Sequence, residues 1–171
     1  LGLSGTLAGT AIFIALLFDA ISDPLAGSLS DNWQSKWGRR HPFMYASALP
    51  LGIAFYFLFS PPEGLSEFSL FLWLTATVVF TRGAMTLYHV PHIALGAELS
   101  EDYDERTQIV SYRYFLGFAG YLVAYYLGFG VFFKDTAEFP RGQFNVDAYA
   151  PYAFVLAITM IVTIVWSGWG T

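Results

Sequence analysis

Long apolar runs separated by short polar stretches dominate the pattern of this 171-residue chain. Five runs match or approach the length of about 20 residues that an α-helix needs to cross a bilayer. They occupy residues 1–28, 43–60, 69–96, 109–133 and 150–169. Most charged and turn-forming residues fall between these runs. The pattern therefore predicts an all-α integral membrane protein with five transmembrane helices.

Composition excludes several other classes of protein. Hydrophobic residues make up 56% of the chain and charged residues 12%, whereas an average soluble domain has about 25% charged residues. The net charge is −5 and the sequence has no basic patch, so nucleic acid is not expected as a partner. Both ends lie in or directly after apolar runs. We therefore expect a part of a longer protein, with the lipid bilayer as its surroundings.

Basic residues are unequally divided among the loops. Loops 29–42 and 97–108 hold most of them, and the loop after the second apolar run holds none. The residues are Lys36, Arg39, Arg40 and Arg106, with Arg113 just beyond, against Lys134 and Arg141 in the last loop. Because short cytoplasmic loops are enriched in lysine and arginine, we expect loops 29–42 and 97–108 to be cytoplasmic. The expected location is the cell membrane, inner or plasma, with several passes.

Two carboxylates interrupt the first apolar run. Asp19 and Asp23 are four residues apart and so share one helix face. Pro24 lacks an N–H group, which leaves the carbonyl of Ala20 without its helical partner and predicts a kink. Carboxylate and carbonyl oxygens on one face suit Na⁺ or a proton. In the alternative interpretation, the helix ends at Phe18 and the segment around Pro24 is a loop.

The third apolar run contains Arg82, Thr86 and His89 at spacings that place them on one helix face. An arginine far from either loop must pair with an acid or line a wet cavity. Asp19 or Asp23 is the expected partner of Arg82. His89 is expected either to face a polar cavity or to pack at the helix end.

The pair His89 and His92 raises the alternative of a membrane metalloenzyme. Pro91 lies between them and is expected to break the helix there, and no other plausible ligand set is evident. We therefore expect no resident cofactor, no catalytic residue, and no metal beyond a possible coupling Na⁺ at the two aspartates. Arg113 has two interpretations: it extends to the membrane interface, or it donates hydrogen bonds to a sugar in a cavity.

Several motifs resemble a known family. Residues 27–31 (GSLSD), followed by the GRR of 38–40, are similar to the loop between helices two and three of major facilitator transporters. With 19–24 (DAISDP) and 37–43 (WGRRHPF), the match narrows to the glycoside–pentoside–hexuronide:cation symporter family. Segments 90–98, 102–107 and 111–113 also resemble this family. The resemblance covers nearly the whole chain and implies helices two to six of a twelve-helix bundle, in its N-terminal half.

The resemblance also implies roles for individual residues. Asp19 and Asp23 match carboxylates that bind the coupling cation, and Thr86 matches a hydroxyl associated with that site. Arg113 matches an arginine that contacts the sugar.

One position departs from the family pattern. His89 stands where a well-known member has an aspartate shared by cation and sugar, and Ile93 stands where that member has a tryptophan. This departure favours H⁺ over Na⁺ as the coupling ion and leaves the substrate open.

The resulting hypothesis is a secondary active transporter that couples the movement of a sugar or glycoside to Na⁺ or H⁺ by alternating access. Arg113 is expected to contact the substrate, together with His89 and Arg82. A latch on the cytoplasmic side is expected from Asp31, Arg39 and Arg40, with the segment from Glu98 to Arg106 as its counterpart. The alternative within the same fold is an anionic or lipid-like solute, which Arg82 in a cavity would suit.

Overall fold

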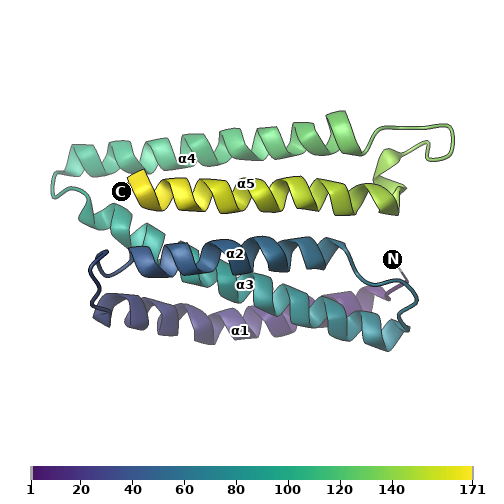
Figure 1. Ribbon diagram of the computed structural model, residues 1–171, viewed down its shortest axis with the longest axis horizontal. Coiled ribbons are helices and arrows are strands. Elements are labelled where there is room, and N and C mark those ends of the chain that lie inside the picture. Colours follow the sequence, from purple (N-terminus) through teal and green to yellow (C-terminus); the bar gives the residue numbers. More distant parts are fainter. Residues whose placement is uncertain (1, 171) are drawn as a thin grey trace.

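Five long helices run side by side in the computed structural model, which describes residues 2–170 (Figure 1). They are α1 (Gly5–Asn32), α2 (His41–Phe59), α3 (Glu67–Glu98), α4 (Tyr103–Tyr126) and α5 (Tyr149–Gly170). A π-helical segment, Leu127–Phe132, continues α4, and two short 3-10 turns, Gly142–Phe144 and Val146–Ala148, precede α5. Each long helix is long and apolar enough to cross a membrane. The prediction of an all-helical membrane chain with five spans is confirmed.

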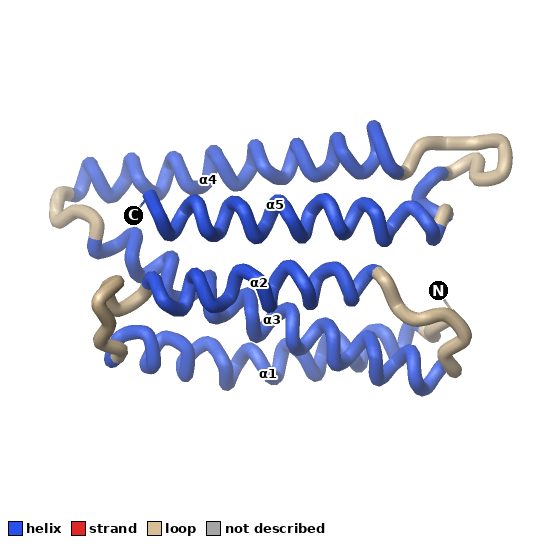
Figure 2. Tube along the Cα trace, viewed as in Figure 1, coloured by secondary structure: helices blue, strands red, loops and turns tan. Residues whose placement is uncertain are grey.

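Successive helices alternate in direction. The α1–α2 and α3–α4 loops lie at one end of the bundle, and the α2–α3 and α4–α5 loops lie at the other (Figure 1). Figure 2 shows that the loops, in tan, are confined to these two ends. Such a path is what a chain that crosses a bilayer repeatedly requires. That the α1–α2 and α3–α4 loops face the cytoplasm stays a prediction.

The helices extend further into the polar stretches than the apolar runs indicated. Parts of the predicted loops 29–42 and 97–108 are helical, and the residues left between helices are 33–40 and 99–102. A helical turn made of polar residues cannot be predicted from apolar runs, but Asp102 indicates where α4 begins. Its side chain accepts hydrogen bonds from the N–H groups of Asp104 and Glu105 and so caps α4. Leu1 and Thr171, at the ends of the chain, lie outside the described residues.

Prolines lie inside helices without ending them. α1 continues through Pro24 and α3 continues through Pro91. The prediction that Pro91 breaks the helix between His89 and His92 is therefore wrong, and the alternative in which the first helix ends at Phe18 is excluded. Ending a helix within hydrocarbon would expose several backbone groups, whereas a proline removes a single hydrogen bond. A continuous helix is therefore the less costly arrangement.

Helix α3 packs against both α1 and α2, and α2 also packs against α5. Small residues permit the close approach, since a Cβ atom on Gly52 of α2 would lie 2.6 Å from Ile161 Cδ1 of α5. The buried core between these helices contains Ala48, Leu51, Ala84 and Ile164. Helix α4 differs, because none of its described residues is buried. The contact of α3 with α1 brings charged residues together in the middle of the bundle.

Candidate functional site

Helices α1 and α3 are parallel and pack in a constant register. Each polar contact between them joins residues 63 positions apart in the sequence. The contacts are Ser4 with Glu67, Asp19 with Arg82 and Asp23 with Thr86. Because α-helices rise by a fixed 1.5 Å per residue, a constant offset means that the two helices run side by side without slipping.

A stripe of small residues on α1 makes this close packing possible. Ala11 and Ala15 are fully buried and lie eight and four residues before Asp19, respectively, on the same face. On α3, Gly83 leaves room for the ring of Phe18, whose Cε1 would lie 3.1 Å from a Cβ atom at that position. The two carboxylates therefore continue a stripe that faces α3.

Asp19 forms an ion pair with Arg82. The Nε and Nη2 atoms of Arg82 both donate to the same carboxylate oxygen, Oδ2. The Asp19 side chain is only 14% exposed, whereas that of Arg82 is 42% exposed. The other oxygen, Oδ1, is buried and has no hydrogen-bond partner among residues 2–170. The sequence had left open which aspartate binds Arg82, and the structure selects Asp19.

Asp23 has a neutral partner. The hydroxyl of Thr86 donates to Asp23 Oδ1 at 2.7 Å, and Thr86 is 6% exposed. Asp23 itself is exposed, and among residues 2–170 only its Oδ1 atom accepts a side-chain hydrogen bond. The buried hydroxyl of Ser22 has no hydrogen-bond partner among the described residues. Carboxylate and hydroxyl oxygens of this kind are ligands for hard monovalent cations or acceptors for a proton.

A cavity of about 840 Å³ lies between α3, α4 and α5, away from this contact. Arg113 and Arg106 of α4 line it, together with His92 and Tyr88 of α3. The rings of Tyr88 and His92 stack with centroids 5.0 Å apart. The structure thus places Arg113 at a cavity wall. His92, which the sequence singled out only as a metal ligand, lines the same cavity. Its four-residue spacing from Tyr88 was the available signal.

His89 is not among the residues that line this cavity, and it is exposed. Within the part of the chain that the structure describes, no group of three or more histidine, aspartate or glutamate side chains is placed to hold a metal ion. His89 and His92 therefore gain no third ligand from the fold.

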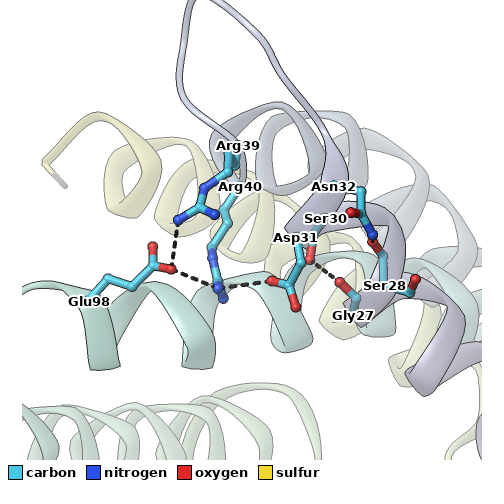
Figure 3. A network of polar contacts seen from close by, with 8 residues as sticks. All are labelled: Gly27, Ser28, Ser30, Asp31, Asn32, Arg39, Arg40 and Glu98. Atoms are coloured by element: carbon cyan, nitrogen blue, oxygen red, sulfur yellow. Dashed lines mark hydrogen bonds and ion pairs between the residues drawn. The ribbon is translucent and has the colours of Figure 1, made fainter.

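Ion pairs join the C-terminal ends of α1 and α3 to the residues just before α2 (Figure 3). The Nη2 atom of Arg40 lies 2.9 Å from both Asp31 Oδ1 and Glu98 Oε1. Arg39 reaches the same oxygen of Glu98 at 3.1 Å. Asp31, Arg39, Arg40 and Glu98, here named the end cluster, are thus brought together as the latch hypothesis expects.

Burial differs strongly between the two arginines of the end cluster. The Arg40 side chain is 9% exposed, and that of Arg39 is 55% exposed. Arg106 does not join the cluster, because its Nε atom donates to the carbonyl of Ser100 at 2.6 Å within the α3–α4 loop. The predicted latch is thus tied together mainly by Arg40.

Five membrane-length helices, with an ion pair inside the bundle, define a polytopic membrane protein. The family described as MFS/sugar transport protein matches residues 1–171. The chain belongs to this family, which consists of transporters and not of enzymes.

Several relatives of the chain are named as symporters. It is 29% identical to an uncharacterized symporter of Synechocystis sp., over 97% of this chain and 30% of the relative. It is 33% identical to the inner membrane symporter YicJ of Escherichia coli, over 70% of this chain and 26% of the relative. The sodium-dependent lysophosphatidylcholine symporter 1 of Mus musculus is 33% identical, over 62% of this chain and 21% of the relative. No solved structure matches significantly.

The chain thus spans 30% or less of the length of these relatives. It is a multi-pass membrane segment, and the relatives include an inner membrane protein.

Proposed function

We propose that the chain forms part of the N-terminal bundle of a cation-coupled symporter that moves a sugar or glycoside by alternating access. The polar contact between α1 and α3 carries this proposal. A charged group inside a bilayer costs at least about 2.5–3.5 kcal/mol, so three such residues at one contact need a function. The family description, with its reference to sugar transport, supports a sugar as the substrate.

In this proposal the coupling ion, Na⁺ or H⁺, binds between α1 and α3. Asp23 supplies a free carboxylate oxygen, Asp19 supplies its unpartnered oxygen, and Thr86 supplies a hydroxyl. Neutralising this negative site removes a charge that opposes closure of the surrounding helices. The occluded state therefore forms more readily with the ion bound, which couples the ion to transport.

The substrate is placed at the cavity between α3, α4 and α5, where Arg113 supplies hydrogen-bond donors. Arg82 and His89 share a different face of α3 and do not line this cavity; we assign them to the path by which the substrate reaches it, with Arg82 held by Asp19. The end cluster is the cytoplasmic gate, with Arg106 fixing the neighbouring loop. Breaking and remaking these ion pairs would accompany each change of access.

Uptake by the full-length protein in membrane vesicles tests the proposed ion site. Imposed Na⁺ and H⁺ gradients are compared for a panel of labelled glycosides and hexuronides. Replacing Asp23→Asn should abolish accumulation under the active gradient, because the site loses its free carboxylate. The matched control is Asp147→Asn, which makes the same change at an exposed position within the 3-10 turn Val146–Ala148 and should leave uptake unchanged. Normal accumulation by the Asp23→Asn variant would refute the site.

A second candidate substrate is an anionic or lipid-like solute. Arg113, Arg106 and His92 line the cavity beside many apolar residues, an arrangement that suits an acidic group on an apolar body. One of the relatives is named for lysophosphatidylcholine. Competition separates the candidates: an anionic amphiphile that blocks uptake while neutral glycosides have no effect would favour the second.

A further inference from the structure

Charge at the α1–α3 contact does not balance. The middle of the two helices holds two carboxylates, Asp19 and Asp23, and one guanidinium, Arg82. Asp31, Glu67 and Glu98 lie at the helix ends. With the histidines neutral, the three charged side chains of the middle sum to −1.

Arg82 neutralises one particular carboxylate. Its Nε and Nη2 atoms both donate to Asp19 Oδ2, and Asp23 accepts from Thr86 rather than from Arg82. Asp23 instead receives a hydrogen bond from the neutral hydroxyl of Thr86. Arg82 thus occupies, as a tethered group, the position that a free cation would take beside Asp19.

We infer that Arg82 is a built-in counter-cation that sets the charge of the proposed ion site at −1 and so limits it to a single monovalent ion. This inference rests on the proposed function, because it concerns the same site, but it adds a residue that determines ion charge and affinity. Asp19 then contributes its buried Oδ1 as a ligand while its negative charge is already compensated. The uncompensated charge is that of Asp23.

The inference predicts that affinity follows net charge rather than the identity of any one side chain. Replacing Arg82→Gln gives a site of charge −2, and replacing Asp19→Asn or Asp23→Asn gives a site of charge 0. The double replacement Asp19→Asn with Arg82→Gln removes the ion pair as a neutral unit and restores −1. Unit charges about one helical turn apart, at an effective dielectric constant of about 20, change an affinity by roughly one to two orders of magnitude.

Na⁺ binding to the purified full-length protein provides the measurement. Na⁺ replaces choline at constant ionic strength and pH 8, and binding is read by calorimetry. Na⁺ is the probe whichever ion drives transport, because a deprotonated site of hard oxygen ligands binds it directly. Ca²⁺ is titrated in parallel, since a site of charge −2 suits a divalent ion.

We expect the Arg82→Gln protein to bind Na⁺ about tenfold more tightly than wild type, or to gain Ca²⁺ binding. The Arg82→Lys protein, which keeps the charge, should stay within about threefold of wild type, as should the double variant. Asp19→Asn alone should lose about tenfold. If the Arg82→Gln protein does not fold, the double variant and Asp19→Asn still form a decisive pair, because only the charge count predicts recovery in the double variant.

Two results would overturn the inference: wild-type ion affinity in Arg82→Gln, or a double variant as weak as Asp19→Asn alone. Failure of the proposed function looks different. If Asp23→Asn binds Na⁺ as wild type does, the ion does not bind at this contact at all. If Asp23→Asn loses binding while Arg82→Gln is unchanged, the site stands and only the role of Arg82 is rejected.

Discussion

A conservative substitution of Thr86 tests whether its hydroxyl takes part in ion binding. Its buried hydroxyl donates to Asp23 and lies among the oxygens assigned to the ion. Replacing Thr86→Val keeps the shape but removes the hydroxyl. A group that hydrogen-bonds a ligating carboxylate and holds it in position typically accounts for about 10–100-fold in ion affinity, so the ion concentration for half-maximal uptake should rise about tenfold or more.

The Thr86→Ser protein is the control for this prediction, since it keeps the hydroxyl and loses only a methyl group. It should retain half-saturation within a few-fold of wild type. Equal half-saturation in the valine and serine variants would show that the hydroxyl has no part in ion binding.

At the same scale, the sequence predicted the polar face of each helix but not the pairing between them. The four-residue spacing of Asp19 and Asp23 places both carboxylates on one face without further information. The partner of Arg82 depends on the register between α1 and α3. That register is set by packing, including the contact of Phe18 with Gly83, which no single-helix pattern contains.

At the scale of the helices, the contact of α2 with α5 makes a prediction about stability. A Cβ atom on Gly52 would lie 2.6 Å from Ile161 Cδ1 and 3.1 Å from the backbone oxygen of Ala157. The backbone oxygen has little freedom to move, so Gly52→Ala should lower the stability of the bundle by roughly 1–3 kcal/mol. Thermal unfolding of the purified protein measures the loss.

Gly96→Ala serves as the comparison, because nothing lies within 4 Å of a Cβ atom at that position of α3. Alanine also has the higher helix propensity, by about 0.8–1.0 kcal/mol in a helix interior. This variant should be as stable as wild type or more so. Equal unfolding of the two variants would show that the α2–α5 contact is not tightly packed.

The number and type of helices could be read from the apolar runs, because a bilayer imposes a length of about 20 residues. Their ends could not, since polar turns continue α1, α3 and α4 beyond the apolar region. The prediction that Pro91 breaks the third helix was wrong for a related reason. The effect of this proline in water, where a broken helix is hydrated, differs from its effect in hydrocarbon, where the helix continues around it.

At the scale of the whole molecule, the end cluster ties three helices together through Arg40. Replacing Arg40→Gln removes the ion pairs with Asp31 and Glu98 at once. Both acids are partly exposed, so the loss is reduced from that of a fully buried pair to roughly 1–2 kcal/mol. We expect the C-terminal ends of α1 and α3 to separate from the N-terminal end of α2 about tenfold more often.

A cysteine placed at Ser30 reports on this opening, because Ser30 is buried beside Asp31 and this chain has no native cysteine. In a full-length protein without other cysteines, a water-soluble maleimide should label Ser30→Cys about tenfold faster when Arg40→Gln is added. Arg39→Gln should have a smaller effect, since Arg40 keeps both acidic partners. Equal labelling rates in all three proteins would show that the cluster does not hold the ends together.

The constant offset of 63 residues between α1 and α3 has a mechanical consequence. If α1 slid by one helical turn in one direction, Asp23 would come level with Arg82, but Asp19 would face Val78. A slide of one turn the other way would set Asp19 level with Thr86 and leave Asp23 facing Val90. Either shift leaves one carboxylate beside an apolar side chain and without its partner, which is costly inside a membrane. The polar contacts therefore permit only one alignment of the two helices. When the protein opens to either side of the membrane, α1 and α3 should therefore move together as one rigid body.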